Sequence, residues 1–308
     1  MNKIALSAGN LTKIYSKNNS LDKSVLALNK LNLEVKQGEI FGLLGPNGAG
    51  KTTFINILGG TVIKTSGKVK LWGFDLDNNP RQVRASIGIV PQEVNFDPFF
   101  SPRKLLELQA GFYGVKKENR ITDLILKMVS LEKQANSYAR TLSGGMKRRL
   151  LIAKAMVHQP PILILDEPTA GVDVELRKNL WGNVKELNKL GVTIILTTHY
   201  LYEAQEMCDR IGIINKGNLV ALNTTQKLLE QIETKKIKFK VKNFNNFEKI
   251  KLNNVKFIKD DSEIIAIYNK NKFKFDEIIN IVKKNVEILD ISTDDADLED
   301  VFLEVTNN

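Results

Sequence analysis

The chain has 308 residues, of which 43% are hydrophobic and 26% charged, as in ordinary globular proteins, and this length allows one large domain and a small one. Its single cysteine, Cys208, excludes an intrachain disulfide and fits a reducing compartment, where we interpret it as a bystander and not a nucleophile. No stretch reaches the roughly 18–20 apolar residues of a membrane span, and the first ten residues lack the apolar run of a signal peptide.

The net charge is +10, which raises the question of a nucleic-acid partner. The basic residues are scattered, however, and the densest run, Lys147-Arg148-Arg149, lies inside a motif discussed below. We therefore interpret the charge as a drift in composition and expect no nucleic-acid partner, although an anionic membrane surface would also attract it. The expected location is the cytosol or the cytosolic side of a membrane.

The N-terminal elements are predicted from apolar alternation and turn residues. Residues 4–24 favour a strand followed by a hairpin loop, and residues 26–35 alternate as a second strand. The apolar run 40–44 is followed at once by glycines and then by a helical pattern over 51–58. A buried strand, a tight loop and a helix, in this order, are typical of an α/β nucleotide-binding fold.

The middle of the chain is predicted to be largely helical from about residue 98 to 156, and alternating strands and helices follow. The expected strands are 162–165, 193–196 and 211–214, and the expected helices are 175–190 and 201–208.

A domain boundary is predicted near residues 231–236, which gives a large domain over 1–232 and a small α+β appendage over 233–308. The excess of basic residues lies before this boundary. In the appendage, strands are expected at 236–242, 264–268 and 287–291, and helices at 275–282 and 298–305.

A phosphate-binding loop is predicted directly after the strand at 40–44, because the sequence there matches G-x-x-x-x-G-K-[ST]. The matching residues are Gly45, Pro46, Asn47, Gly48, Ala49, Gly50, Lys51 and Thr52. Glycines let backbone N–H groups converge on phosphate oxygens, and the following helix directs its positive end at the same anion. Lys51 would add a full charge, Thr52 would ligate Mg²⁺, and Thr53 joins the nucleotide-binding set.

Two adjacent carboxylates end the apolar strand at 162–165. Open α/β sheets hold ligands at the C-terminal ends of their strands, which is where Asp166 and Glu167 lie. Neighbouring residues on a strand point to opposite sides, so the two acids are expected to have different roles. Asp166 suits the Mg²⁺ shell, usually through water, and Glu167 suits polarising the attacking water as a general base.

A second anion-binding helix start is predicted at Ser143-Gly144-Gly145. Ser143 is a good N-cap residue, and the two glycines leave backbone N–H groups accessible at the positive end of the helix. A plain capped helix would explain the same tripeptide on its own.

The order of these motifs resembles that of the ABC ATPases, with Leu-Ser-Gly-Gly at 142–145 as the signature between the phosphate loop and the Asp166-Glu167 strand. The likeness covers roughly residues 4–230. It implies a P-loop NTPase core with an antiparallel β subdomain and an α-helical subdomain over about 93–160, followed by the small C-terminal appendage.

The resemblance also implies roles for four residues outside these motifs. Tyr15 looks like the aromatic that stacks on adenine, and Gln92 like the glutamine that reaches Mg²⁺ and the water. Asp173 matches the loop that crosses the dimer seam, and His199 matches the histidine that contacts the γ-phosphate. The other histidine, His158, carries no motif and is interpreted as structural.

Within the family the chain looks like the ATP-binding subunits of type-2 exporters. This rests on the residues around Gln92, on Gly171-Val172-Asp173 in place of the Ala-Leu-Asp of many importers, and on the tail at 298–304. The resemblance implies binding of ATP and Mg²⁺, ATP hydrolysis, and a head-to-tail dimer of two copies around two ATP molecules. It also implies an integral membrane permease of the type-2 class and a peripheral position on the cytoplasmic face of the membrane.

Two alternatives stay open. One is a soluble ABC ATPase acting on ribosomes or nucleic acid, although such proteins usually carry two cassettes or long coiled coils. The other is a non-catalytic nucleotide sensor, against which intact Glu167 and His199 argue.

Overall fold

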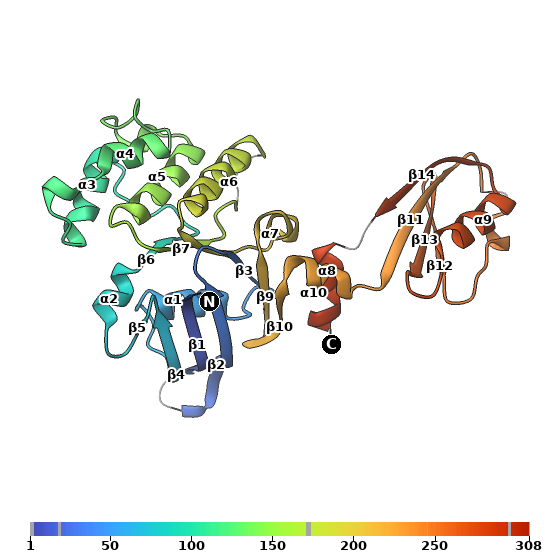
Figure 1. The fold of residues 1–308 in the computed structure, drawn as a ribbon, viewed down its shortest axis with the longest axis horizontal. Coiled ribbons are helices and arrows are strands. Elements are labelled where there is room, and N and C mark those ends of the chain that lie inside the picture. Colours follow the sequence, from blue (N-terminus) through green and yellow to red (C-terminus); the bar gives the residue numbers. More distant parts are fainter. Residues whose placement is uncertain (1–2, 18–19, 171–173, 245, 295–296, 308) are drawn as a thin grey trace. The chain divides into compact units, whose positions relative to one another are not determined.

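The computed structural model describes residues 3–17, 20–170, 174–244, 246–294 and 297–307. They form two compact units, Met1–Asn223 and Thr224–Asn308, which are described separately (Figure 1). Helix α8 (Thr225–Gln231) contacts helix α10 (Leu298–Asn307) and belongs to the second unit. The domain boundary at residue 232 stays a proposal from the sequence.

The centre of the first unit is a six-stranded sheet of order β10-β9-β3-β8-β7-β6. Its strands are β3 (Ile40–Leu44), β6 (Ile87–Val90), β7 (Ile162–Asp166), β8 (Thr193–Thr197), β9 (Arg210–Asn215) and β10 (Asn218–Thr224). The pairs β3–β8, β3–β9, β6–β7 and β7–β8 are parallel. Parallel strands are covered on both faces, which explains their continuous apolar runs. The C-terminal ends of β7 and β8 consequently meet at one edge, beside the loop after β3.

A second sheet in this unit is antiparallel, with order β2-β1-β4-β5. Its strands are β1 (Ile4–Lys17), β2 (Ser20–Lys36), β4 (Ser66–Leu71) and β5 (Phe74–Asp75). The predicted loop up to residue 24 is wrong, because β2 begins at Ser20, which pairs with Lys17. The polar residues there lack an apolar alternation, and only pairing with β1 makes them a strand.

The helices of the first unit are α1 (Lys51–Leu58), α2 (Pro80–Ala85), α3 (Pro102–Phe112), α4 (Thr122–Met128), α5 (Gly144–Met156), α6 (Val174–Lys189) and α7 (Leu201–Met207). Short 3₁₀ turns lie at Lys117–Asn119 and Ala139–Thr141. Helices α3, α4 and α5 form a group (Figure 1) with a hydrophobic cluster of its own that includes Leu106, Leu126 and Leu150. A separate cluster joins the two sheets around Phe41 and Phe54.

The second unit holds an antiparallel sheet of order β12-β13-β11-β14. Its strands are β11 (Thr234–Val241), β12 (Lys256–Asp260), β13 (Glu263–Asn269) and β14 (Ile288–Asp294), with helix α9 (Phe275–Asn285) and a 3₁₀ turn at Phe247–Lys249. Alternate residues of β11, Ile237 and Phe239, pack with Ile278 and Val282 of α9. The period-2 pattern in the sequence therefore marks one buried face.

Cys208 is buried directly after α7. Burial, with a smaller contribution from Asp209, raises the pKa of its thiol, so the thiolate that reacts with electrophiles is suppressed. We expect a disulfide reagent such as Ellman's reagent to leave Cys208 unmodified in the folded protein and to modify it fully in denaturant. Rapid modification of the folded protein would contradict this burial.

Candidate functional site

The loop between β3 and α1 curls tightly against neighbouring backbone. A Cβ on Gly45 would lie 2.2 Å from the carbonyl oxygen of Ile214, and one on Gly50 would lie 2.5 Å from that of Ala27. Gly50 also has φ +112°, in the region that favours glycine. Helix α1 then begins at Lys51 without a side-chain cap, which leaves its first N–H groups available to an anion.

Lys51 is buried, with 6% of its surface exposed, and its ammonium lies over the loop. Its Nζ donates to the carbonyl oxygens of Gly45, at 2.6 Å, and Pro46, at 3.1 Å. Burial lowers the pKa of Lys51, and the carboxylates of Glu167 and Asp166 oppose that shift. The loop thus already holds a desolvated ammonium group. Its N–H donors could turn from the two carbonyl oxygens to a phosphate oxygen.

The end of β7 carries the two carboxylates, and each has its own partners. Asp166 Oδ1 accepts from the Thr197 hydroxyl at 2.6 Å. Glu167 Oε2 lies 3.2 Å from Gln92 Nε2 and 3.2 Å from His199 Nδ1. The two acids therefore have separate surroundings, as their adjacent positions predict.

The backbone of Glu167 is unusual, because its φ is +46°. This left-handed conformation is uncommon for a residue other than glycine and costs of the order of 1–3 kcal/mol unless the surroundings enforce it. The amide N–H of Glu167 donates to the Thr197 carbonyl at 3.0 Å, which contributes to holding the turn. Such strain is concentrated at functional sites.

The structure brings Gln92, Glu167 and His199 into direct contact, and the charge of Lys51 interacts with both carboxylates. The partially exposed His199 ring also lies against Tyr200, with 4.1 Å between the ring centroids. These residues come from strand ends and loops that are far apart in the sequence, so the fold assembles them into one site.

Within the described ranges, the hydrogen bonds of Ser143 in the signature stay inside its own helix and do not reach Gln92, Glu167 or His199. Ser143 caps α5: its Oγ accepts from the amide of Met146 at 3.3 Å, and its carbonyl accepts from that of Lys147 at 2.9 Å. Ser143 and Gly144 are exposed, so the start of α5 is accessible from solvent.

Of the two remaining predicted residues, the structure describes Tyr15 but not Asp173. Tyr15 lies on β1 with 40% of its surface exposed, and Lys13 Nζ lies 4.6 Å from the centre of its ring. Asp173, predicted at the dimer seam, lies outside the described residues.

His158 is half-buried and packs against Tyr113. Its ring stacks on Tyr113 with centroids 3.6 Å apart, and its Nε2 lies 2.9 Å from the Ile87 carbonyl oxygen. Burial lowers the pKa of His158, against a smaller opposing effect of the Ile87 contact. These contacts agree with the structural interpretation.

The predicted metal ligands offer a hydroxyl from Thr52, an amide oxygen from Gln92 and a carboxylate from Asp166. All three are oxygen donors, which suit Mg²⁺. No group of three or more His, Cys, Asp or Glu side chains in the described ranges could hold a metal ion by itself.

Sequence reasoning missed Thr197 and Arg148. The Thr197 hydroxyl binds Asp166, and Arg148 donates to the carbonyl oxygens of Gln92 and Glu167 at 2.6 and 2.9 Å. Thr197 could have been found from its place at the end of an apolar strand, two residues before His199. Arg148 gave no such signal, because it lies in a basic run that also suits a solvated helix face.

Comparison with known proteins places this site in a family. Residues 28–170 match the model of the ABC transporter domain. The linearmycin resistance ATP-binding protein of Bacillus subtilis is 38% identical over 230 residues, which are 74% of this chain and 71% of that protein. The Nod factor export ATP-binding protein I of Burkholderia orbicola is 39% identical over 207 residues, which are 67% and 68%.

Solved structures show the same fold. A dimeric ATP-binding cassette in a post-hydrolysis state, bound to ADP and Pi, has a TM-score of 0.63 at 28% identity, over 71% of this chain and 98% of that one. The cbiO1 protein of Clostridium perfringens, part of an ABC transporter complex, has a TM-score of 0.65 at 27% identity, over 74% and 92%.

The chain therefore belongs to the ABC transporter family, and it is an ATP-binding subunit with the P-loop NTPase fold of the ABC ATPases. This confirms the predicted family and fold class. The relatives are named for export and resistance, and they do not favour the alternative of an ABC ATPase acting on ribosomes or nucleic acid.

Proposed function

We propose that this protein hydrolyses Mg-ATP as the peripheral, cytoplasmic-face subunit of an ABC exporter. One observation carries the catalytic part: Gln92 and His199 both contact Glu167, whose carboxylate also interacts with the charge of Lys51 in the phosphate loop. The exporter part is supported by relatives named for Nod factor export and linearmycin resistance.

ATP would bind first through its phosphates. The N–H groups of the loop from Gly45 to Gly50, with Lys51 and Thr53, would surround the β and γ phosphates. Lys51 Nζ would exchange its contacts with Gly45 and Pro46 for phosphate oxygens. The half-exposed ring of Tyr15 offers a stacking surface for adenine.

Thr52, Gln92 and Asp166 would hold Mg²⁺ on the side of the β and γ phosphates. Mg²⁺ bound there supplies positive charge that offsets the charge developing on the phosphate oxygens. The Thr197 hydroxyl, which donates to Asp166 Oδ1, would fix the orientation of that carboxylate.

Hydrolysis would follow from the contacts of Glu167. Its carboxylate would accept a proton from a water molecule whose oxygen attacks the γ phosphorus, while Gln92 orients that water. The bond between the γ phosphorus and the β–γ bridging oxygen breaks, which yields ADP and inorganic phosphate. His199, whose Nδ1 lies 3.2 Å from the same Glu167 oxygen as Gln92, would contact the γ-phosphate oxygens.

A second copy of the chain would complete the site. Ser143 and Gly144, which are exposed at the start of α5, and Gly145, which is buried behind them, would supply donors to the γ-phosphate held by the partner's loop, with Asp173 at the seam. A Cβ on Gly144 would meet nothing within 4 Å, so packing within the chain gives no reason for glycine there. Close approach of a nucleotide gives one. The two copies would be related by a two-fold axis.

Substituting Gly144→Asp tests this role of the signature. The fold should survive, because the position is open and an acid in the first turn of a helix is favourable. The new carboxylate would repel the γ-phosphate, so we expect ATP-dependent dimerisation to be lost and turnover to fall by about 10²-fold or more.

Gly182→Asp is the matched control for this substitution, since Gly182 on α6 is equally open. It should leave dimerisation and turnover near the wild-type level. Light scattering with ATP and a phosphate-release assay measure both properties. A Gly144→Asp protein that still dimerises would remove the signature from the site.

A membrane permease of the type-2 class is the proposed second partner. In this proposal the permease supplies the pathway across the bilayer. No helix in the described ranges of this chain has the length and apolarity to cross a membrane. Val94, Phe99 and Phe100 follow Gln92 and expose 47%, 63% and 39% of their surfaces. Exposed apolar side chains that follow Gln92 so soon in the sequence suit docking of the permease.

Purification of the tagged chain from its own cells, in mild detergent, tests the whole proposal. We expect steady ATP turnover and one copurifying integral membrane protein. Copurification of ribosomes or nucleic acid in place of a membrane protein would favour the soluble alternative. A preparation that binds ATP without turnover would favour a nucleotide sensor.

A further inference from the structure

Arg148 connects the signature helix to the backbone of the hydrolytic residues. It lies in α5, and only 4% of its surface is exposed. Its Nε donates to the Pro168 carbonyl oxygen at 2.7 Å and its Nη2 to that of Glu167 at 2.9 Å. Its Nη1 donates to the carbonyl oxygens of Pro91, at 2.9 Å, and Gln92, at 2.6 Å.

The four carbonyl groups belong to two short segments that each contain a proposed catalytic side chain. Pro91-Gln92 follows β6, and Glu167-Pro168 follows β7. The side chains of Gln92 and Glu167 meet at 3.2 Å, and one guanidinium binds the backbone carbonyls behind both. A planar guanidinium with five donors can join two segments in this way, which a lysine ammonium cannot.

This connection also acts on the strained residue of the site. Glu167 has φ +46°, and Arg148 holds the carbonyl oxygens of Glu167 and of the next residue, Pro168. Hydrogen bonds from a charged donor are stronger than those between neutral groups, so they can offset the cost of a left-handed backbone conformation. Arg148 is therefore able to stabilise the turn that aims the Glu167 side chain.

The exposed signature lies at the N-terminal end of α5, five residues before Arg148, because Ser143 caps this helix. A helix moves as a unit, so a shift of Ser143 carries the Arg148 guanidinium with it. If the signature moves when it closes on the partner's nucleotide, Arg148 would transmit that movement to the backbone of Gln92 and Glu167 in the same chain.

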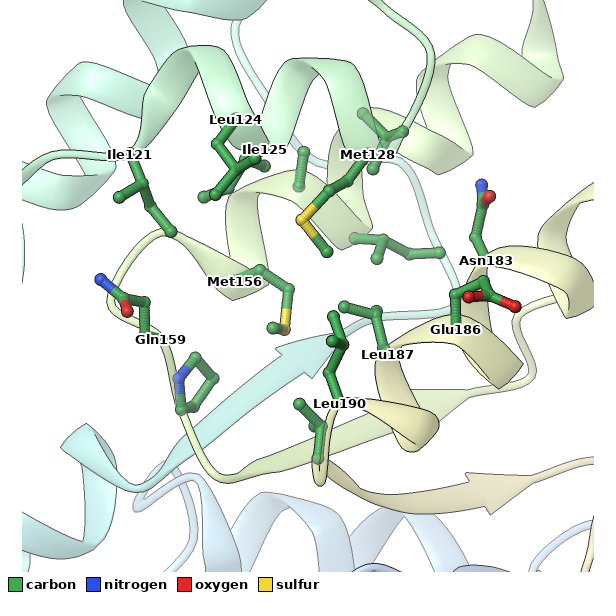
Figure 2. Close-up of a pocket in the computed structure, with 15 residues that line it drawn as sticks. Ile121, Leu124, Ile125, Met128, Met156, Gln159, Asn183, Glu186, Leu187 and Leu190 are labelled. Carbon is green, nitrogen blue, oxygen red and sulfur yellow. The ribbon is translucent and has the colours of Figure 1, made fainter.

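The packing around α5 leaves room for such a shift. An apolar hollow of about 500 Å³ separates α4 and α5 from α6, and Figure 2 shows Met128 and Met156 extending into it opposite Leu187 and Leu190. Close-packed interfaces resist small displacements, whereas flexible methionines beside a void can adjust. The polar connection through Arg148, in contrast, already makes four hydrogen bonds.

We propose that Arg148 is a positioning residue that makes hydrolysis at a chain's own phosphate loop depend on what its own signature binds. The proposal rests on the nucleotide-sandwich dimer proposed above. It adds that each signature has two tasks: to grip the partner's nucleotide, and to arrange Gln92 and Glu167 of its own chain.

Arg149 provides a matched control. It is the next residue of α5, and its Nη1 donates to the carbonyl oxygens of Val129, at 2.7 Å, and Ser130, at 3.0 Å. Both belong to the turn after α4, within the same helical group as α5. Arg149 thus has the same chemistry and a similar position, but its contacts do not reach the proposed catalytic residues.

The experiment compares Arg148→Met and Arg148→Lys with Arg149→Met in the full chain. We expect both Arg148 variants to bind ATP with nearly wild-type affinity and to turn it over about 10²-fold more slowly, as for a catalytic group displaced by about 1 Å. For two coupled sites we expect a wild-type Hill coefficient for ATP between one and two, and in both Arg148 variants it should fall to about one. Arg149→Met should keep the rate and the Hill coefficient.

Thermal unfolding of all variants separates positioning from folding, because a merely structural role would lower the melting temperature without changing the Hill coefficient. Arg148→Lys with the wild-type rate and Hill coefficient would overturn the proposal, whatever Arg148→Met does. A wild-type Hill coefficient of one would also overturn it, since there would be no dependence to transmit. Absence of wild-type turnover would instead contradict the proposed function itself.

Discussion

Glu167→Gln should bind ATP and hydrolyse it about 10²–10⁴-fold more slowly than the wild type, the range typical of a lost general base. The amide has the size of the carboxylate and can keep the contacts with Gln92 and His199, but it cannot accept the proton of the attacking water. Phosphate release at saturating ATP measures the loss. A second expected result is that the variant accumulates as a nucleotide-bound dimer, because the γ-phosphate is not removed.

Glu206→Gln is the control for this prediction, because Glu206 is an exposed acid on α7. It should turn over ATP at the wild-type rate. If Glu167→Gln also did so, Glu167 would not be the base, and another group would have to accept the proton.

Lys51→Ala should weaken ATP binding by about 10²-fold, because charge-assisted hydrogen bonds contribute about 1.5–3 kcal/mol each. In the free protein the ammonium is already buried and directed at the loop carbonyls of Gly45 and Pro46. Little reorganisation is therefore needed before it meets a phosphate, and its loss removes a preformed contact. Titration of a fluorescent ATP analogue measures the affinity.

Lys64→Ala is the matched control, since Lys64 is a half-buried lysine of the same unit that pairs with Asp77 at 2.8 Å. It should keep nucleotide affinity while losing its ion pair. Equal weakening of ATP binding by both substitutions would mean that overall charge, and not the position of Lys51, attracts the nucleotide.

Much of the fold could be predicted because local pattern and tertiary role agree. The run Ile162–Leu165 is apolar because a parallel strand is covered on both faces, and the glycines after β3 mark a loop that allows no side chain at Gly45 or Gly50. The strands of the antiparallel sheet were harder to predict. Strand β4, with the sequence Ser-Gly-Lys-Val-Lys-Leu, owes its conformation to pairing with β1.

The site likewise has parts that local sequence patterns predict and parts that depend on contacts between distant segments. The phosphate loop and the Asp166-Glu167 pair follow from spacing, since each lies within a few residues. The meeting of Gln92 with Glu167 spans 75 residues, and it was expected only through the resemblance to ABC ATPases. Arg148 was missed because its partners are carbonyl groups on two other segments, which no pattern in α5 can reveal.

The central claim is that one terminal phosphate is held by the Lys51 loop of one copy and by the Ser143 turn of the other. A structure of the Glu167→Gln protein trapped with Mg-ATP tests it most directly. The account predicts two copies around two nucleotides, with each Ser143 hydroxyl within hydrogen-bonding distance of a γ-phosphate bound to the partner's loop. A trapped protein that stays monomeric at every concentration, with Ser143 remote from any phosphate, would contradict it.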